Sequence, residues 1–569
     1  MKKAVSLIIS LLIILSGISC AAYASGAGDE ALCFAVASDI HFNLPREELE
    51  HDIDDDIFFY GNRRAAMEDE SGYILDEFLS QCADDEKTEY VLISGDLADD
   101  GRIVAEQHET VAAKLRDFEE KTGKSVFVCN GNHDTGAADS DFKNEDFRRV
   151  YGAFGYDEAL DSDPTCLSYT VNLGKKYRLI VGDSCDPTVS TEDGLTQSRL
   201  NWIIRQAKKA YDEGRYPVLM MHHNLLDHMP AQRLISHNFI VRNHTAYAEQ
   251  IANAGIKVVL TGHEHGSDAI SYTSASGNTV TDFSTTSLTM YPLEYRVFSF
   301  TDNSIDYSKR SIDKIDTDAL AANTAGFTDE QIALMNEDFG KYSKDFFKAC
   351  IRYRLTLALS AEKLGIKESD FYYDFVMTAV NSLTDILAMP LYGPGSVEEL
   401  AATYNIEIPA SDYADGWDVV TEVLAHHYEG GENCDLDSPE VRIILNVADL
   451  VLLHGLSAVN DETAFKGLNL IFDSLFGTGD LSRDFTRFMA NTAGPVTVGE
   501  YFLVGVASPL IYGLAYDRDG LDDNNGSIPG YGVNNKTENI SDNLRSKIGN
   551  FFKYFSFFFK YFLKIFRIG

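Results

Sequence analysis

The chain has 569 residues, of which 45% are hydrophobic and 24% are charged. This composition is typical of a globular protein with several domains, so a single small module and a largely disordered chain are both excluded. The 88 acidic residues outnumber the 48 basic residues, and the formal net charge is -40. Because such a surface repels polyanions, we expect no nucleic acid polymer as a partner.

The first 24 residues have the pattern of a secretory signal. Two lysines precede an apolar run over residues 4–15, and small residues lead to an A-x-A motif that ends at Ala24. The run is shorter than the about 20 residues that cross a bilayer. We therefore expect residues 1–24 to be a signal peptide and the mature protein to be secreted and extracellular. A permanent N-terminal anchor and lipidation at Cys20 are the alternatives.

Short apolar runs alternate with amphipathic stretches over residues 30–315. Ile103–Lys121 and Leu195–Tyr211 predict helices, whereas Asn278–Ser284 and Tyr295–Tyr307 predict strands without an intervening helix. The other predicted strands are 33–38, 90–94, 126–129, 177–182, 217–221 and 257–260. The alternation predicts an α/β domain whose sheet is covered by helices and is partly antiparallel.

The pattern becomes helical over residues 318–515, which we expect to form an all-α C-terminal domain. Thr328 and Gln331 have the spacing of a capping box, and Ser438 precedes Pro439 at the start of another helical pattern. Residues 516–545 are rich in Asp, Asn and Gly, which predicts a solvated polar linker.

The last segment, 546–569, combines aromatic residues with cations. Lys553, Lys560 and Arg567 recur every seven residues opposite a broad aromatic face. Within a bilayer each lysine near the centre costs about 2.5–3.5 kcal/mol, which disfavours a spanning helix. We expect an amphipathic helix that lies in the interface and tethers the protein to the outer face of the cytoplasmic membrane. Packing of this tail on its own protein or on a partner is the alternative.

Five short polar motifs each follow a predicted strand. They are Asp39-Ile-His41, Gly95-Asp96-Leu-Ala-Asp99, Gly131-Asn132-His133-Asp134, Met221-His222-His223-Asn224 and Gly262-His263-Glu-His265. Singly, the motifs at 95–99 and 131–134 are also typical of turns with capping carboxylates, and a lone histidine is more often a surface or core residue than a ligand. In open α/β sheets, however, the turns after the strands meet at one edge, so we expect the motifs to converge. Carboxylate, amide and imidazole donors without thiolate suit two ions such as Mn, Fe or Zn, and the glycines are expected to allow sharp turns.

The order of these motifs resembles the calcineurin-like metallophosphoesterase superfamily, whose pattern is D-x-H, GD-x-x-D, GNH-[DE], H and GH-x-H, over about residues 33 to 311. The resemblance implies a layered sandwich of mixed sheets flanked by helices. It implies that one metal is held by Asp39, His41 and His265, that the other is held by Asn132, His222 and His263, and that Asp96 bridges them. It also implies that His133 is the acid at the leaving group and that Asp99 orients it. Because Asn224 replaces the proline of the usual His-His-Pro, His223 is an alternative ligand to His222.

Further segments resemble secreted bacterial cyclic-nucleotide phosphodiesterase-like proteins that carry a helical C-terminal domain. They are 147–151, 155–159, 163–169 and 224–228. This resemblance implies hydrolysis of a small, cyclic-nucleotide-like phosphodiester. Two divalent ions add about +4 and Asp39 and Asp96 about -2, which leaves about +2 for the phosphoryl group and an attacking metal-bound hydroxide.

Two other functions are open at this stage. One is a phosphomonoesterase or a hydrolase of cell-wall or lipid phosphodiesters, and the other is a non-catalytic cell-surface binding module. Substrate contacts are predicted for Arg63 and Arg64, which follow three aromatic residues at 58–60 and either cap the pocket or lie in an acidic surface loop. His223 and His228 are further candidates, and a structural role is the alternative for His228. No function is expected for His426, His427 or His454.

Overall fold

The computed structural model describes residues 31–45, 65–135, 140–186, 193–228, 232, 238–324, 327–364, 366–370, 373–435, 437–451, 454, 514–517 and 520–533. Several predictions concern residues outside these ranges. They are the signal peptide over 1–24, the membrane tail over 546–569, the substrate contacts of Arg63 and Arg64, and most of the predicted helical domain beyond residue 451.

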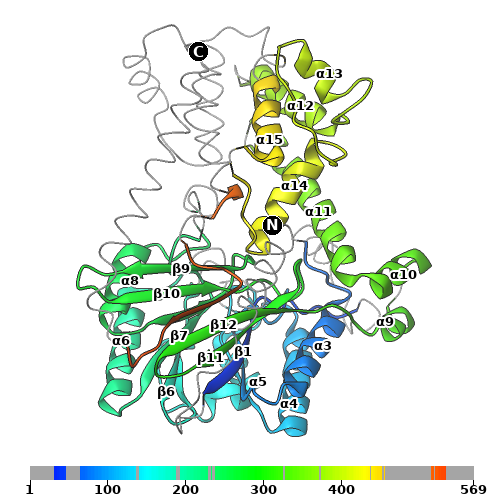
Figure 1. The fold of residues 1–569 in the computed structure, drawn as a ribbon. Helices are drawn as coiled ribbons and strands as arrows, with labels where there is room; N and C mark the ends of the chain where they lie inside the picture. Colours follow the sequence, from blue (N-terminus) through cyan, green and yellow to red (C-terminus); the bar gives the residue numbers. More distant parts are fainter. Residues whose placement is uncertain are drawn as a thin grey trace, which may run out of the picture.

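The first sheet has six strands in the order β13-β12-β11-β1-β2-β3 (Figure 1). β1 runs parallel to β2, which runs parallel to β3, whereas β11, β12 and β13 add antiparallel strands at the other side of β1. The strand bounds are β1 Leu32–Ala37, β2 Tyr90–Ile93, β3 Ser125–Val128, β11 Glu294–Phe300, β12 Ser304–Ser311 and β13 Asn525–Pro529.

The second sheet has seven strands in the order β4-β5-β6-β7-β8-β10-β9. Strands β6, β7, β8 and β10 are parallel neighbours, and antiparallel strands close both sides. The bounds are β4 Asp161–Ser162, β5 Tyr169–Leu173, β6 Tyr177–Gly182, β7 Tyr216–Met221, β8 Val258–Thr261, β9 Asp268–Thr273 and β10 Thr279–Ser284.

The two sheets pack face to face, and helices cover both outer faces. Successive side chains of a strand point to opposite faces, and in β1 Phe34 and Val36 enter the core between the sheets while Ala35 and Ala37 enter the core under the helices. The first sheet is covered by α3 Ser71–Asp84, α4 Ala105–Thr122 and α5 Asn144–Val150, which leads into the π-helical turn Gly152–Tyr156. The second is covered by α6 Gln197–Asp212 and α8 His244–Asn253. The predicted sandwich of mixed sheets flanked by helices is confirmed.

Most of the predicted strands are present within one or two residues, and the stretch Tyr295–Tyr307 divides into the β11–β12 hairpin. Four strands, β4, β5, β9 and β13, are not among those that the pattern predicts. β9 is an edge strand whose second half is only partly buried, so its sequence Asp-Ala-Ile-Ser-Tyr-Thr lacks the apolar run of a central strand.

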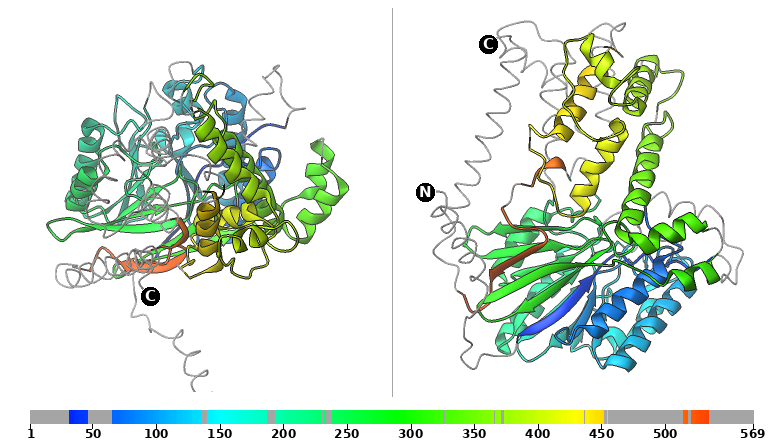
Figure 2. Two further views of the ribbon diagram at one scale, coloured as in Figure 1. Left: turned by 90° about the horizontal axis from the view of Figure 1, so that it is seen from above. Right: turned by 45° about the vertical axis from the view of Figure 1, so that its right-hand side comes forward.

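Helices α11 to α15 stand on one end of the sandwich (Figures 1 and 2). As predicted, Thr328 and Gln331 form a capping box at the start of α10, and Pro439 is in the first turn of α15 after Ser438. Apolar side chains around Trp417 and Ile443 form a separate core there. The helices are α9 Thr317–Asn323, α10 Asp329–Glu337, α11 Phe339–Ala358, α12 Tyr373–Ala388, α13 Val397–Ala402, α14 Gly416–Tyr428 and α15 Pro439–Leu450.

The prediction of a solvated linker is wrong for residues 520–533. Residues 525–529 form β13, which pairs with β12, and Ile528 is buried between the sheets. Tyr531 stacks on Tyr216 with ring centroids 4.9 Å apart and donates its hydroxyl to the Pro217 carbonyl. A polar composition misleads here because an edge strand needs only one inward side chain and backbone pairing to be held in place.

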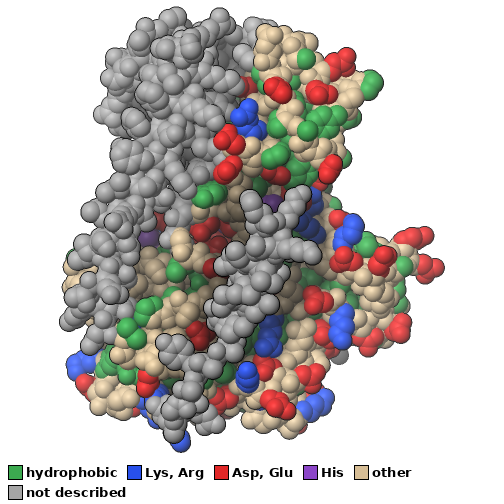
Figure 3. All heavy atoms as spheres, in the orientation of Figure 1, with side chains coloured by type: hydrophobic (Ala, Val, Ile, Leu, Met, Phe, Trp, Pro, Cys, Tyr) green, Lys and Arg blue, Asp and Glu red, His purple; other side chains and the backbone are tan. Residues whose placement is uncertain are grey.

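In the view of Figure 3, acidic side chains are spread over the described surface of the α/β sandwich and of the helices that stand on it, with basic side chains among them. None of the helices in the described part of the chain combines the length and the apolar character needed to cross a membrane.

Candidate metal centre

The five polar motifs occupy the turns that follow β1, β2, β3, β7 and β8. Backbone hydrogen bonds hold these turns against one another. Asp39 N donates to Gly95 O at 3.0 Å and His41 N donates to Asp96 O at 2.9 Å. Gly262 N donates to His222 O at 3.0 Å. The expected convergence is therefore present, and the two sheets contribute jointly to one site.

Five residues of the motifs have left-handed backbone conformations that a side chain disfavours. Their φ angles are 49° for Asp39, 43° for His41, 49° for Asp96, 67° for His263 and 66° for His265. Such conformations persist where the surrounding structure fixes them, and they concentrate at functional sites. The folded sandwich thus holds these side chains in directions that relaxed turns would not provide.

The three motif glycines serve two different purposes. Gly95 has a φ of 108°, as expected for a sharp turn. Gly131 and Gly262 instead allow close approach: a Cβ atom on Gly131 would collide with the Asp96 carboxylate, and one on Gly262 would collide with Ser38 and Asp39. The predicted turn role is therefore confirmed only for Gly95, because the other two are needed to make room for the ligand carboxylates.

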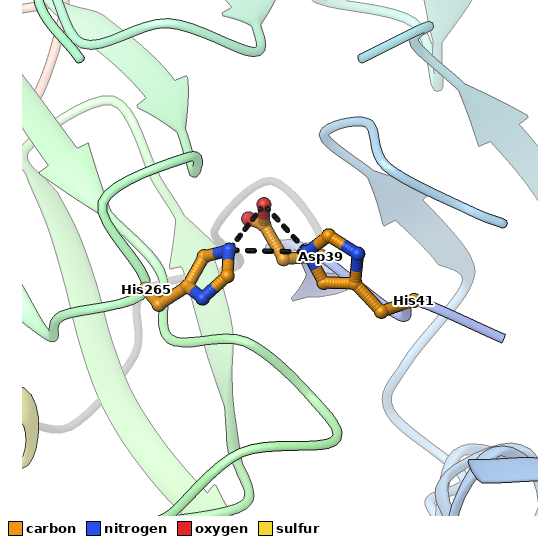
Figure 4. Close-up of side chains that lie close together, drawn as sticks. All are labelled: Asp39, His41 and His265. Carbon is orange, nitrogen blue, oxygen red and sulfur yellow. Dashed lines mark hydrogen bonds and ion pairs between the residues drawn. The ribbon is translucent and has the colours of Figure 1, made fainter. Parts of the chain in front are cut away.

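One cluster contains Asp39, His41 and His265 (Figure 4). His265 Nε2 lies 3.1 Å from Asp39 Oδ1 and 3.1 Å from His41 Nε2. His41 Nε2 lies 3.8 Å from Asp39 Oδ1. Asp39 and His41 are buried, and the His265 side chain is 16% exposed. Two imidazole nitrogens and one carboxylate oxygen thus face a common point.

A second cluster contains His222, His263, Asn132 and Asp96. His222 Nε2 lies 3.0 Å from Asn132 Oδ1, 3.0 Å from His263 Nδ1 and 3.3 Å from Asp96 Oδ2. The other ring nitrogen of His222 donates to the carbonyl of Ser94 at 3.0 Å, because a carbonyl only accepts. This bond leaves Nε2 as the lone-pair nitrogen that faces the other donors.

Asp96 joins the two clusters through one carboxylate oxygen. Asp96 Oδ2 lies 3.3 Å from His222 Nε2 and 3.8 Å from His41 Nε2, while Oδ1 accepts the backbone N–H of His133 at 2.8 Å. Burial alone would raise the pKa of Asp96, but the surrounding histidines, His222 foremost, hold it well below its usual value. The carboxylate is therefore ionised, as a bridging ligand must be.

The donor set fits two divalent cations. In both clusters imidazole nitrogens approach each other to about 3 Å beside a carboxylate, and a cation between them would satisfy all these lone pairs at once. Without a cation the two histidines differ in their pKa. Burial lowers the pKa of His222, but nearby carboxylates raise it to about 9. Burial and neighbouring histidines hold the pKa of His263 well below its usual value. His263 Nε2 is buried without a hydrogen bond in the structure.

His133 and Asp99 lie beside the clusters and contact each other. His133 Nδ1 lies 2.7 Å from the backbone carbonyl of Asp99, whereas the Asp99 carboxylate lies 3.0 Å from His41 Nδ1. Asp99 thus contacts His133 as predicted, and it does so through its backbone carbonyl. The backbone of Asp99 orients His133, and its carboxylate orients His41. Sequence spacing cannot separate these two roles because both atoms belong to one residue.

The two histidines predicted as substrate contacts are both engaged inside the protein. His223 is buried, its Nδ1 lies 2.9 Å from Ser184 Oγ, and burial lowers its pKa to about 3. The geometry thus places His222, and not His223, among the ligand candidates. His228 Nδ1 lies 2.8 Å from Asp268 and Nε2 lies 3.2 Å from Asp282. Both nitrogens thus face buried carboxylates, which favours the structural role for His228, and its substrate contact stays a prediction.

Asp134 has a positioning role that its sequence motif does not predict. Its carboxylate accepts the backbone N–H groups of Leu97 at 3.0 Å, Ala98 at 3.1 Å and Gly131 at 2.8 Å. Burial and the nearby Asp96 raise the pKa of Asp134 to about 8. This carboxylate ties the turn after β2 to the turn after β3, and its place at the end of Gly131-Asn132-His133-Asp134 was the available signal.

Residues 33–267 match the sequence family described as calcineurin-like phosphoesterase. No curated protein matches the chain.

Solved structures are similar to parts of the chain at low identity. A dimetal phosphatase from Danio rerio is 12% identical, with 50% of this chain and 97% of that chain covered and a TM-score of 0.37. The purple acid phosphatase PPD1 from Lupinus luteus seeds is 10% identical, with 53% and 58% covered and a TM-score of 0.34. The NAD nucleotidase NadN of Haemophilus influenzae is 12% identical, with 66% and 69% covered and a TM-score of 0.29.

Proposed function

We propose that this protein, whose residues 33–267 match the calcineurin-like phosphoesterases, hydrolyses small phosphodiesters at a centre of two metal ions. That it is a metal-dependent phosphoric ester hydrolase follows from this match and from the convergent His and Asp side chains. The proposal adds the diester substrate, of the cyclic-nucleotide kind, and the two-ion arrangement.

The observation that carries the proposal is the position of Asp96 between the two imidazole clusters. One carboxylate oxygen within 4 Å of ring nitrogens from both clusters is the arrangement that lets a single residue serve two ions. Bound divalent ions would supply Lewis-acid stabilisation of charge on the phosphoryl oxygens and lower the pKa of a water at the site. Asp39, His41 and His265 would hold one ion, Asn132, His222 and His263 the other.

His133 is assigned the proton transfer to the leaving group. Its Nδ1–H donates to the Asp99 carbonyl at 2.7 Å, which fixes one proton on Nδ1. Nε2 of His133 is then the atom that donates a proton when the ring is charged and accepts a proton when the ring is neutral. The backbone N–H of His133 donates to Asp96 Oδ1, so the imidazole and the proposed bridging carboxylate are held in fixed relation.

The proposal is tested by activity on a panel of substrates after chelation and addition of Mn²⁺. The panel contains cyclic nucleotides, a bis-nitrophenyl phosphate diester and a nitrophenyl phosphate monoester. We expect the diesters and cyclic nucleotides to be hydrolysed faster than the monoester. A monoester preference would contradict the diester substrate, and no metal-dependent activity on any substrate would contradict the reaction itself.

For the location of the protein we propose secretion followed by tethering through residues 546–569, on the sequence pattern alone. Deletion of residues 546–569 is expected to release active enzyme from vesicles that contain anionic lipid. Equal partitioning of the truncated and the full-length mature protein would contradict the tether.

A further inference from the structure

The end of helix α14 lies against the loop that carries two of the proposed metal ligands. This loop follows β8 and contains His263, Glu264 and His265. Ser267 N donates to the Tyr428 carbonyl at 3.0 Å, and a Cβ atom on Gly266 would be in van der Waals contact with His427. The helical part therefore reaches the metal centre itself, although it begins 50 residues after the matched segment ends at residue 267.

Two carboxylates face the imidazole of His427. Its Nδ1 lies 2.5 Å from Glu432 Oε1, and its Nε2 lies 3.7 Å from Glu264 Oε1. The side chains of His427 and Glu264 are 7% and 5% exposed. Burial lowers the pKa of His427, but these carboxylates raise it well above its usual value. The second oxygen of Glu264 accepts from Gln232 Nε2 at 2.7 Å. Glu264 thus accepts a hydrogen bond from Gln232 through one oxygen, while its other oxygen faces the buried His427 imidazole.

His265, the second proposed ligand in this loop, has a separate support that involves α11 and α14. His265 Nδ1 lies 2.8 Å from the sulfur of Met290. Met290 and Tyr291 belong to one apolar cluster with Phe347 of α11 and Ala425 of α14. His263 and His265 both have left-handed backbones, so the loop between them needs such external supports to keep its conformation.

We propose that His427 is a positioning residue of the metal centre, which acts through Glu264 to fix the loop bearing His263 and His265. The inference rests on the proposed function only in taking these two histidines as metal ligands. His427 touches neither metal nor substrate in this account. This role gives a defined task to the helical part, which contains α9 to α15. The task is to support a site whose proposed ligands all come from the α/β part.

The test compares two neighbouring histidines of α14 in the full chain. His427→Ala removes the contact with Glu264. His426→Ala is the matched control, because His426 pairs with Glu422 of α14 at 3.4 Å and with Glu429, which follows the helix, at 3.9 Å. The measurements are the Mn²⁺ dissociation constant of the metal-free protein and its thermal unfolding midpoint without metal. We expect His427→Ala to weaken Mn²⁺ binding roughly 10-fold or more, as the loss of a residue that holds metal ligands in place does. We expect His426→Ala to bind Mn²⁺ with an affinity near that of the wild type.

Two further variants keep the inference testable if His427→Ala does not fold. Glu264→Gln preserves side-chain size while it removes the charge facing His427, and it is expected to weaken Mn²⁺ binding in the same direction. His427→Gln retains a donor and is expected to restore part of the affinity. Wild-type affinity in both His427→Ala and Glu264→Gln, or equal weakening by His426→Ala, would overturn the inference. Wild-type protein that binds no Mn²⁺ would instead overturn the proposed function.

Discussion

The metal centre of the α/β part and the surface of the helical part use their charged residues in opposite ways. In the α/β part, carboxylates and imidazoles are buried together at one edge of the sheets, and Asp39, Asp96 and His222 are at most 1% exposed. In the helical part, the charged pair of Lys341 with Asp345 lies in solvent, with side chains 57% and 54% exposed. Where charges are buried their positions and protonation states are fixed by neighbours, whereas exposed charges are screened by water.

This difference indicates which substitutions affect catalysis and which affect only the surface. Buried charges cost free energy to desolvate, so the cluster of Asp39, Asp96 and His222 is explained by a function that needs it. The end of α14 differs from that surface, because His427 and Glu432 are buried at the junction with the metal centre.

The largest effect is expected from Asp96→Asn, which keeps side-chain size and tolerates the left-handed backbone. Loss of the proposed bridging charge should remove several kcal/mol of transition-state stabilisation, or roughly 10³-fold in kcat. Steady-state kinetics and bound metal measure this. The control is Asp76→Asn, an exposed aspartate paired with Lys114. Near wild-type turnover by folded Asp96→Asn would refute the bridging role.

A smaller and selective loss is expected from His133→Ala. Substrates with a poor alkoxide leaving group need a proton, so their hydrolysis should slow by roughly 10²- to 10⁴-fold. Nitrophenyl esters, which leave without protonation, should be affected much less. The two rates are compared at equal metal content. Equal losses on both substrate types, or loss of bound metal, would show that His133 is not the acid.

Buried His108 in α4 predicts a pH-dependent contribution to stability. Burial lowers its pKa from 6.5 to about 4, and its neutral ring is satisfied by the Tyr151 hydroxyl at 3.0 Å and the Asp134 carbonyl at 3.2 Å. His108 binds a proton near pH 6.5 in the unfolded chain but only near pH 4 in the native protein. The free energy of unfolding therefore falls by about 3 kcal/mol as the pH falls through this window. Denaturant unfolding from pH 7 to pH 4 should show a shallower decline in His108→Gln, and an unchanged slope would contradict this.

The smallest effect is expected where charges are exposed, in either part of the molecule. Lys341→Ala in the helical part and Lys121→Ala in α4 each remove an exposed i,i+4 ion pair. Each should lower the free energy of unfolding by about 0.3–0.5 kcal/mol and leave turnover unchanged. If Lys341→Ala lowers the free energy of unfolding by more than about 1 kcal/mol while Lys121→Ala does not, exposure does not determine how much these ion pairs contribute to stability.

The fold and the site differ in how far the sequence predicts them. Central strands such as β1 and β6 are predictable because continuous apolar runs mark burial on both faces, and the polar motifs after them mark the site. β13 escaped prediction because its strand character depends on pairing with β12, more than 200 residues away. Its composition carries no trace of that contact.

Within the site, residue types were predictable but individual contacts were not. His222 and His223 are adjacent in sequence, and only the orientation of β7 decides that His222 faces Asp96 while His223 faces Ser184. The contact of His427 with Glu264 joins two parts of the chain with no shared pattern. Such long-range contacts are set by packing, which no local spacing encodes.

The most direct test of the account is a titration of metal-free protein with Mn²⁺, in which hydrolysis of bis-nitrophenyl phosphate is followed together with bound metal. If Asp96 serves two ions, activity should be absent after chelation and should rise until about two equivalents are bound. Full activity in the chelated protein, or saturation at a single bound ion, would contradict the two-metal centre.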